Sequence, residues 1–420
     1  MMAAVERARP AAEGSFPQDF LWGAATAAHQ TEGNNVSSDM WLVERVKPTL
    51  YREPSGDACN SLELWSKDLD LVKELGLNTY RFSLEWARIE PERGSFSNAM
   101  LDHYRAVAEG CCERGIHPVV TLSHFSIPRW FAACGGWTHS DAPELFAAYC
   151  DRAARRLAGS LAFAVTLNEP NIIRIVNRLL PDEAVKLIAA MNAAAGKACG
   201  STHFKAGLLP EPGDIETTES NMLAAHKASR AAIKAVRRDL PVGVSLSMSD
   251  DQAAGSNSIR DAMRSRFYGP WLELARTDEF LGVQNYTRSI WSNSGKVPPP
   301  QGSKVSQLGM EIYSPSLAGA VRYAHEATGV PILVTEHGVC TRDDAERMRF
   351  IRDSLIDLRR TIAKGVPVKG YIHWSLIDTF EWIFGYEQQY GLCAVDRGTF
   401  RRSPRPSALL LRDIARRNAV

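Results

Sequence analysis

The sequence predicts a closed barrel of eight alternating β-strands and α-helices, a (β/α)8 fold in a single domain. Short β-rich segments alternate with longer amphipathic stretches from about residue 16 to the end of the chain. This alternation indicates βαβ units on a parallel sheet, and eight such units favour a closed barrel over an open sheet. No stretch rich in Pro, Gly or Ser interrupts the pattern as a linker would.

Eight segments carry the β-rich pattern, and amphipathic stretches lie between them. In residues 61–76, for example, apolar residues recur at three- and four-residue spacing and Gly76 is placed to end a helix. The predicted strands are 20–28, 79–86, 117–125, 162–170, 242–250, 278–286, 331–338 and 369–376.

The main interruption follows the fourth predicted strand. Residues 171–201 predict one or two additional helices before the next regular barrel helix, which we expect to begin near Glu219. Such an insertion leaves the barrel at the C-terminal ends of the strands, the face that carries active sites in barrels of this kind.

Composition bounds the classes of protein and partner. A length of 420 residues suits one large barrel or two ordinary domains, and 45% hydrophobic residues suffice for a sizeable core. A net charge of +1 gives no excess of basic residues of the kind that binds nucleic acid or an anionic membrane. No apolar run approaches the roughly 20 residues of a membrane span. We therefore expect a small-molecule substrate, with no nucleic-acid or membrane partner; the oligomeric state stays open.

The N-terminus and the cysteines bear on cellular location. Residues 1–15 lack the unbroken apolar core of a secretory signal, so we expect an unordered leader followed by one domain over 16–420. The eight cysteines show no C-x-x-C pairs and cluster with no histidines. Free thiols in a reducing cytoplasm are the favoured interpretation, with no bound metal.

Two carboxylates stand at the ends of predicted strands, Glu169 in TLNEP and Glu336 in VTEHG. A barrel gathers its strand ends around one crevice, so these side chains are expected to face each other. A separation of about 5–5.5 Å would suit double-displacement hydrolysis of a glycoside, and roughly 6.5–9.5 Å would suit inversion. Strand-end carboxylates also cap helices, bind metals or join structural networks, so the pair alone does not settle its role.

Other polar and aromatic residues lie at the same predicted rim. Arg81 stands within an apolar strand, where a guanidinium is costly unless it meets an anion. Hydrogen-bonding side chains converging on one rim suit a polyhydroxylated substrate, and aromatic faces suit the CH face of a pyranose. Trp86 has a core position as its alternative. The candidates besides Arg81 are Gln30, His124, Asn168, Asn285, Tyr286, Trp130, Trp374 and Trp382.

Several ordered motifs make the chain resemble the family 1 glycoside hydrolases, the β-glucosidase and β-galactosidase family with a (β/α)8 TIM barrel. The resemblance runs from about Phe16 to the last helix, and the order of the motifs on the predicted strands makes chance agreement improbable. The motifs are FPQDFLWGAATAAHQTEG, YRFSLEWARIEPERG, TLSHFSIPRW, TLNEP, FLGVQNY, VTEHG, and WSLIDTFEWIFGY followed by YGL.

This resemblance implies a retaining β-glycosidase that needs no cofactor, with Glu169 as the acid/base and Glu336 as the nucleophile. Arg81, Asn285 and Tyr286 would support the catalytic pair. The resemblance assigns the hydroxyls of the non-reducing sugar to Gln30, His124, Asn168, Glu381 and Trp382, with Trp374 as the platform beneath the ring.

Five positions depart from the usual family pattern. They are Asn171 after the TLNEP motif, Ser126 after the His-aromatic pair, His337 after the second glutamate, Thr379 before FEW, and Gln389 before YGL. None removes a carboxylate, but each bears on substrate preference because neighbouring residues orient the groups that touch the substrate.

The sequence gives separate predictions for the sugar and for the aglycone of the substrate. Neutral β-D-glucosides are the leading expectation, followed by galactosides and fucosides; Glu381 would repel a 6-phosphate. Residues 172–191 are rich in Ile, Leu and Met. They are interpreted either as a helix packed over the barrel rim or as the wall of an apolar aglycone pocket.

Three other functions compete with hydrolysis. A transglycosidase would share both glutamates and exclude water better, a glycoside-binding protein would have lost turnover, and an unrelated barrel enzyme would require the motif order to be accidental. Product analysis separates the first two from hydrolysis, because transfer yields new glycosides and a binding protein yields no product.

Overall fold

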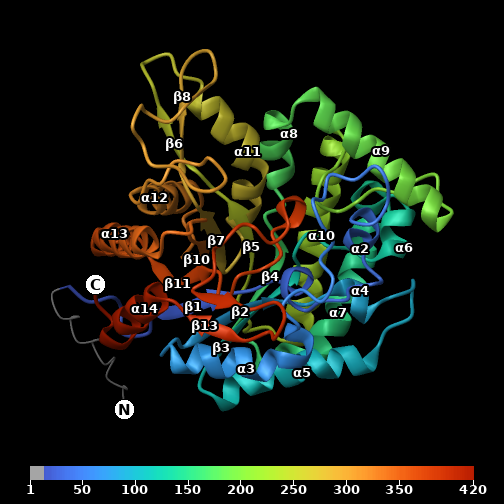
Figure 1. The fold of residues 1–420 in the computed structure, drawn as a ribbon, viewed down its shortest axis with the longest axis horizontal. Coiled ribbons are helices and arrows are strands. Elements are labelled where there is room, and N and C mark those ends of the chain that lie inside the picture. Colours follow the sequence, from blue (N-terminus) through green and yellow to red (C-terminus); the bar gives the residue numbers. More distant parts are fainter. Residues whose placement is uncertain (1–13) are drawn as a thin grey trace, which may run out of the picture.

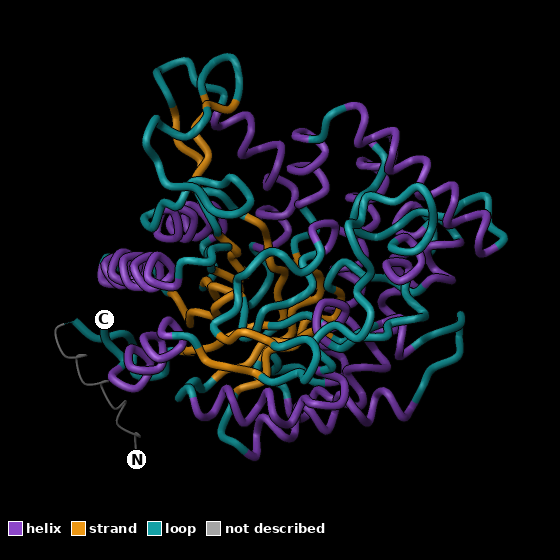
Figure 2. Tube along the Cα trace, in the orientation of Figure 1, coloured by secondary structure: helices purple, strands orange, loops and turns teal. Residues whose placement is uncertain are grey.

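Eight parallel strands close a barrel at the centre of the computed structural model, which describes residues 14–420 (Figures 1 and 2). The order is β1-β11-β10-β7-β5-β4-β3-β2, so the first and last strands pair and the predicted fold class is confirmed. Each predicted segment contains or overlaps one barrel strand. The strands are β1 (Leu21–Ala25), β2 (Thr79–Ser83), β3 (His117–Ser123), β4 (Phe163–Asn168), β5 (Val242–Ser247), β7 (Phe280–Asn285), β10 (Ile332–His337) and β11 (Val368–Trp374).

A long helix follows each barrel strand and covers its outer face (Figure 2). The helix predicted over 61–76 is confirmed, and Gly76 ends it with φ +64°, a left-handed conformation that glycine adopts without a steric penalty. The eight helices are α3 (Ser61–Glu74), α5 (Asn98–Glu113), α7 (Ala142–Leu157), α10 (Ile215–Val236), α11 (Arg260–Ala275), α12 (Ser316–Thr328), α13 (Asp344–Ala363) and α14 (Pro406–Arg417).

The hydrophobic core has two layers. Side chains alternate along each barrel strand, so one set fills the barrel and the other packs against the helices. A large cluster lies between strands and helices, and a smaller one fills the barrel interior. The interior cluster includes Leu21, Val119, Val165, Phe280, Leu333 and Ile372.

The predicted insertion after β4 forms two helices, α8 (Ile172–Leu179) and α9 (Asp182–Cys199), above the barrel in Figure 1. Helix α10 begins at Ile215 rather than near Glu219, because a 3-10 turn over Pro212–Asp214 leads directly into it. Shorter helices lie in other loops: α1 (Ala28–Thr31), α2 (Asp39–Val43), α4 (Trp86–Ile89) and α6 (Arg129–Ala133).

Two small sheets escape the sequence pattern because their strands are only two to four residues long. One sheet, ordered β6-β8-β9, lies beyond α11 and α12 (Figure 1). The other is antiparallel. Their strands are β6 (Asp250–Ala253), β8 (Arg288–Trp291), β9 (Lys296–Val297), β12 (Cys393–Val395) and β13 (Arg402–Pro404).

The two ends of the described chain meet beside β1. Ser15 forms an isolated antiparallel bridge with Ala419, and the Phe16 amide donates to the Asn418 carbonyl over 2.9 Å. The predicted leader over 1–15 lies outside the described residues except for its last two positions. Within 14–420, no helix combines the length and apolarity needed to span a bilayer.

Candidate active site

Both candidate glutamates lie where barrel strands end. Glu336 is the penultimate residue of β10, and Glu169 directly follows β4. Each lies beside an irregularity in its strand ladder, between Val334 and Glu336 in the pairing with β7 and between Val165 and Asn168 in the pairing with β5. Such irregularities re-aim the side chains that follow them.

Glu169 has a left-handed backbone, with φ +44°. This conformation is unusual for a residue with a side chain and persists only where surrounding contacts impose it. The Glu169 amide donates to the Ser245 carbonyl over 2.8 Å. The buried Asn171 amide group donates to the Ser247 carbonyl over 2.8 Å and accepts from the Ser247 amide over 3.0 Å. Asn171, which departs from the family pattern, therefore fastens the turn that carries Glu169 to β5.

Glu336 is held by two donors in a buried setting. Nη1 of Arg81 lies 2.5 Å from Oε1, and the Tyr286 hydroxyl donates to Oε2 over 2.6 Å. Arg81 is completely buried, which is tolerable because its remaining donors reach Oγ1 of Thr121 at 3.0 Å and Oδ1 of Asn168 at 2.5 Å. The anion that the sequence predicted for Arg81 is thus Glu336.

The two carboxyl groups have different electrostatic surroundings. Burial, followed by the charge of Glu336, raises the pKa of Glu169 to about 8, although Ser247 and Arg81 oppose the shift. Burial also raises the pKa of Glu336, but the charge of Arg81 and the hydrogen bonds from Tyr286 and Arg81 oppose that shift. The site therefore favours a proton on Glu169 and a negative charge on Glu336.

Asn168 joins this pair to its neighbours. Its Oδ1 accepts from Nε2 of Gln284 over 2.7 Å as well as from Arg81, and its Nδ2 lies 3.3 Å from Nε2 of His124. Gln284 was missed from the sequence. The signal was available, because Phe280 is in the interior cluster and the two-residue period of β7 places position 284 on the same face.

Glu381 forms another part of the rim together with Gln30. Nε2 of Gln30 donates to the Phe380 carbonyl over 2.9 Å and lies 3.4 Å from Oε1 of Glu381. The Thr379 hydroxyl donates to the same Oε1 over 2.5 Å. Burial, with the charges of Glu336 and Asp378, raises the pKa of Glu381 to about 8. Thr379, one of the departing positions, is therefore a direct partner of Glu381.

Aromatic rings line the same region. The ring of His124 is nearly parallel to that of Trp374 at 5.6 Å and 15°, and to that of Trp382 at 6.2 Å and 11°. Trp130 instead packs edge-on against Trp86, and Trp86 is a buried core residue. The structure thus brings Trp374 and Trp382 together with the polar candidates and leaves Trp130 outside.

Three of the rim side chains each have a buried polar atom with no hydrogen-bond partner among the described residues. These atoms are Oε1 of Gln30, Nδ1 of His124 and Oε1 of Gln284. A buried orphan of this kind is costly, so such groups mark places where a polar ligand would bind. Over the described part of the chain, no three His, Cys, Asp or Glu residues are grouped so as to hold a metal ion.

Asn285 and three departing positions hydrogen-bond groups other than the two glutamates. Nδ2 of Asn285 donates to the carbonyls of Met248 and Thr287, which fixes the backbone beside Tyr286. The three departing positions also make other contacts. Ser126 donates to Glu85 over 2.7 Å, and His337 contacts the Tyr371 hydroxyl at 3.0 Å and stacks on Phe350. The backbone of Gln389 forms hydrogen bonds with Gln307 and Thr341.

A cavity of about 210 Å³ is lined by Gln284 and by Tyr286, the residue that donates to Glu336. Helix α8 contributes Ile172 and Ile175 to its wall, whereas α9 packs against α2. Only the start of the predicted apolar wall over 172–191 therefore faces the cavity. Its other apolar lining side chains are Met248, Phe267, Trp291 and Met310.

Comparison with known proteins identifies the family of the chain. The profile described as glycosyl hydrolase family 1 matches residues 12–195 and 273–420, which include both glutamates. β-Glucosidase A of Acetivibrio thermocellus is 27% identical, covering 96% of this chain and 99% of the relative. The thermostable β-glucosidase B of Thermobispora bispora is 29% identical, covering 97% and 92%. The crystal structure of β-glycosidase BGL167 has a TM-score of 0.91 at 43% identity, covering 96% and 98%. The chain therefore belongs to glycosyl hydrolase family 1 and is a glycoside hydrolase.

Proposed function

We propose that this enzyme is a retaining β-glycosidase that releases terminal non-reducing β-D-glucosyl residues, with galactosyl and fucosyl residues as secondary substrates. The observation that carries the proposal is the buried carboxyl pair with unequal support. Glu336 receives bonds from Arg81 and Tyr286, whereas the pKa of Glu169 is raised to about 8. One group suits nucleophilic attack and the other suits proton donation.

The reaction proceeds in two balanced halves. Glu336 attacks the anomeric carbon while Glu169 gives its proton to the departing glycosidic oxygen, which yields a glycosyl ester and a free alcohol. Ester formation removes the negative charge from Glu336, and with it the interaction that raises the pKa of Glu169. Glu169 then accepts a proton from the water that attacks the ester, and the free sugar leaves with retained configuration. Neither half requires a metal or an organic cofactor.

We place the sugar between Trp374 and the rim residues. We assign Trp374 as the platform beneath the ring, and the orphan atoms of Gln30, His124 and Gln284 as partners for its hydroxyls. Asn168, Glu381 and Trp382 complete the hydroxyl-binding set. Burial that raises the pKa of Glu381 also penalises a charged 6-phosphate, which favours neutral sugars.

The aglycone occupies the cavity beside Tyr286. Its lining by Ile172, Ile175 and other apolar side chains suits an apolar or aromatic group, and the substrate class is a small-molecule β-glycoside or oligosaccharide. A cytoplasmic location stays a prediction, supported by eight cysteines that are all free thiols.

The test is hydrolysis of p-nitrophenyl β-D-glucoside, followed by proton NMR of the sugar as it is released. We expect the β-anomer to appear first. Glu336→Gln should lower kcat/KM at least about a thousandfold. Glu169→Gln should lower kcat/KM most for glycosides with poor leaving groups, because these need the proton from the acid. Glu90→Gln is the matched control, because Glu90 is also a buried carboxyl group with a raised pKa but bonds Trp86 and Gly94 instead. Initial release of the α-anomer would refute retention, new glycosides would indicate transfer, and binding without either product would indicate a receptor.

A further inference from the structure

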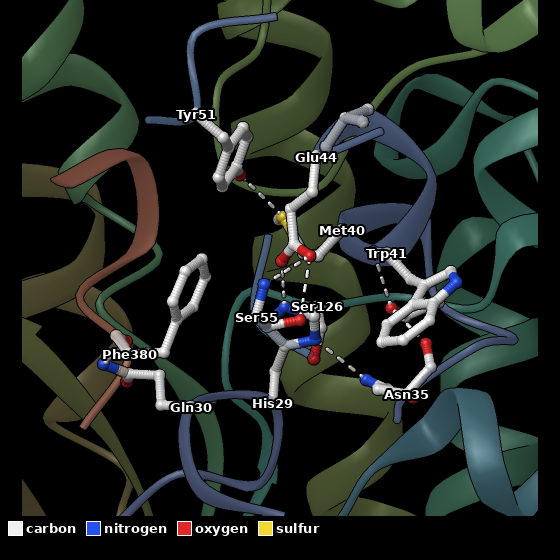
Figure 3. A network of polar contacts seen from close by, with 12 residues as sticks. His29, Gln30, Asn35, Met40, Trp41, Glu44, Tyr51, Ser55, Ser126 and Phe380 are labelled. Atoms are coloured by element: carbon white, nitrogen blue, oxygen red, sulfur yellow. Dashed lines mark hydrogen bonds and ion pairs between the residues drawn. The ribbon is translucent and has the colours of Figure 1, made fainter. Parts of the chain in front are cut away.

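His29 and Glu44 form a buried ion pair beside Gln30 (Figure 3). Nε2 of His29 is 2.7 Å from Oε1 of Glu44, and neither side chain is exposed to solvent. His29 directly precedes Gln30 in α1, whereas Glu44 follows α2, so only the histidine of the pair shares a helix with a rim residue. The other carboxylate oxygen of Glu44 accepts from the amide and the hydroxyl of Ser55 and from Arg45. None of these contacts takes part in the proposed reaction.

The surroundings of His29 favour its charged form. Burial lowers its pKa, but the hydrogen bond and charge of Glu44, with the charges of Glu85 and Asp39, outweigh burial and leave the pKa raised. The pKa of Glu44 is lowered against the opposing effect of its own burial. Both shifts point to an imidazolium–carboxylate pair.

The Asn35 side chain can supply the second acceptor that a doubly protonated His29 ring needs. Its Nδ2 lies 3.0 Å from Nδ1 of His29, and its Oδ1 has no partner among the described residues. An imidazolium ring carries a proton on each nitrogen and needs two acceptors. Turning the Asn35 amide by half a rotation would present Oδ1 to Nδ1, so Glu44 and Asn35 would satisfy both donors.

His29 contacts the rim through Trp382. The two rings are nearly parallel, with centroids 5.6 Å apart and an angle of 8°. Trp382 has a left-handed backbone, with φ +52°, and its indole is only partly buried. Such a conformation needs support from neighbouring groups. Trp382 is also nearly parallel to His124, which in turn stacks on Trp374, so ring contacts run from His29 to the sugar platform.

We propose that the His29–Glu44 ion pair is a positioning unit that fixes Trp382 and Gln30, and that it thereby sets the affinity of the enzyme for the non-reducing sugar. A cation stacked on an indole face is attracted to the negative ring face, and the attraction is strongest where water is excluded. The inference rests on the proposed function, because it treats Trp382 and Gln30 as sugar-binding residues. His29 touches no reacting atom, so the chemical steps should be little affected by its loss.

The experiment separates affinity from chemistry. Glu44→Gln removes the charge of the pair and His29→Phe keeps a stacked ring without charge. Because His29→Phe alone leaves Oε1 of Glu44 buried without its partner, the double variant H29F/E44Q is the decisive protein. We expect the inhibition constant for the released sugar, and KM for its p-nitrophenyl glycoside, to rise about tenfold, while kcat changes less than about threefold.

A second buried pair provides the matched control. Nε2 of His226 lies 3.1 Å from Oδ1 of Asp278, both side chains are buried, and neither contacts the rim. The variant H226F/D278N should lose comparable stability and keep the wild-type inhibition constant. A folded H29F/E44Q protein with unchanged sugar affinity, a loss confined to kcat, or an equal loss of affinity in the control would each overturn the inference. If the wild-type enzyme releases no sugar from any aryl β-glycoside, the proposed function has failed instead.

Discussion

At the scale of single residues, the chemistry depends on how one proton and one negative charge are divided between Glu169 and Glu336. Arg81 and Tyr286 contact only Glu336 of the two, so they favour the charge on that side. The charge of Glu336 in turn raises the pKa of Glu169. The pH profile of the enzyme therefore reports both groups together.

The alkaline limb of that profile follows from Glu169. Its pKa of about 8 means that the proton needed by the leaving group is present below this pH and lost above it. We expect kcat/KM for a glucoside with a poor leaving group to fall above pH about 8. The measurement is kcat/KM for an alkyl β-glucoside between pH 5 and pH 10, to be set beside that for a dinitrophenyl glucoside. Equal alkaline limbs for both substrates would contradict the assignment of Glu169 as the acid.

The acid limb follows from Arg81. Its charge lowers the pKa of Glu336 against burial, so Arg81→Met should raise that pKa. Because Glu336 must be ionised to attack, the acid limb of kcat/KM should move to higher pH, and the maximum should fall by a factor of about 10² or more. Arg402→Met is the matched control, since Arg402 forms a buried pair with Asp68. An unchanged acid limb in Arg81→Met would be the contrary result.

Strand-end positions allowed the sequence to predict which residues of the candidate site lie together, for a physical reason. Parallel strands in a closed barrel bring their C-terminal ends to one rim, so Gln30, Glu169 and Glu336 need not be near in sequence to meet. The roles of Thr379 and Asn171 could not be read in this way. Their contacts run across loops whose path depends on tertiary packing, and each forms only in the folded chain.

At the scale of elements, the connection from β4 to α8 determines where Glu169 points. Two hydrogen bonds join Asn171 to the backbone of Ser247, and a third joins the Glu169 amide to Ser245. The left-handed backbone of Glu169 thus depends on β5 rather than on its own helix.

Removing the two hydrogen bonds between Asn171 and Ser247 should reduce catalysis more than sugar binding. We expect Asn171→Ala to lower kcat about tenfold, equivalent to ~1.4 kcal/mol, because Glu169 loses part of its orientation. Asn221→Ala is the matched control, since the Asn221 side chain also makes two backbone bonds, to Trp137 and His139. Michaelis–Menten kinetics and thermal unfolding on both proteins provide the test. Equal kcat in the two variants would show that the turn carrying Glu169 does not need the hydrogen bonds of Asn171.

Helix α8 is the element that should set aglycone preference. Ile175 lines the cavity, so Ile175→Ala should raise KM for bulky aromatic or polycyclic β-glucosides by about fivefold or more and leave methyl β-glucoside unaffected. Ile188→Ala in α9 is the control, because Ile188 is buried but lines no part of this cavity. A uniform change across alkyl and polycyclic substrates would count against an apolar aglycone site.

At the scale of the whole molecule, the barrel is closed where its first strand pairs with its last, and the two ends of the described chain meet at the same place. β1 pairs with β11, and helix α14 returns the C-terminus to the start of β1. Asn418 fastens this junction: Oδ1 accepts from Nε1 of Trp22 over 2.9 Å, and Nδ2 donates to the carbonyls of Phe16 and Pro17, each over 2.9 Å. The sequence predicted the closed barrel, but it gave no signal for this side-chain clamp between residues some 400 positions apart.

The clamp should contribute measurably to global stability. We expect Asn418→Ala to lower the free energy of unfolding by about 2–3 kcal/mol, through the lost hydrogen bonds and the left-handed backbone that alanine disfavours. Asn34→Ala isolates the backbone effect, because Asn34 has a similar φ of +49° and donates to Asp57 through an exposed side chain. Urea unfolding of both variants measures the difference. If the two variants lose equal stability, the junction does not hold the barrel closed.

The retaining mechanism requires that Glu336 forms a covalent bond to the sugar. A 2-deoxy-2-fluoro β-D-glucoside with a dinitrophenyl leaving group slows hydrolysis of the ester more than its formation, so the intermediate should accumulate. Peptide mapping by mass spectrometry should then locate the fluorosugar on Glu336, with no labelling in Glu336→Gln. An adduct on any other residue would contradict the nucleophile assignment. Absence of an adduct from an enzyme that hydrolyses ordinary aryl β-glucosides would contradict the retaining mechanism itself.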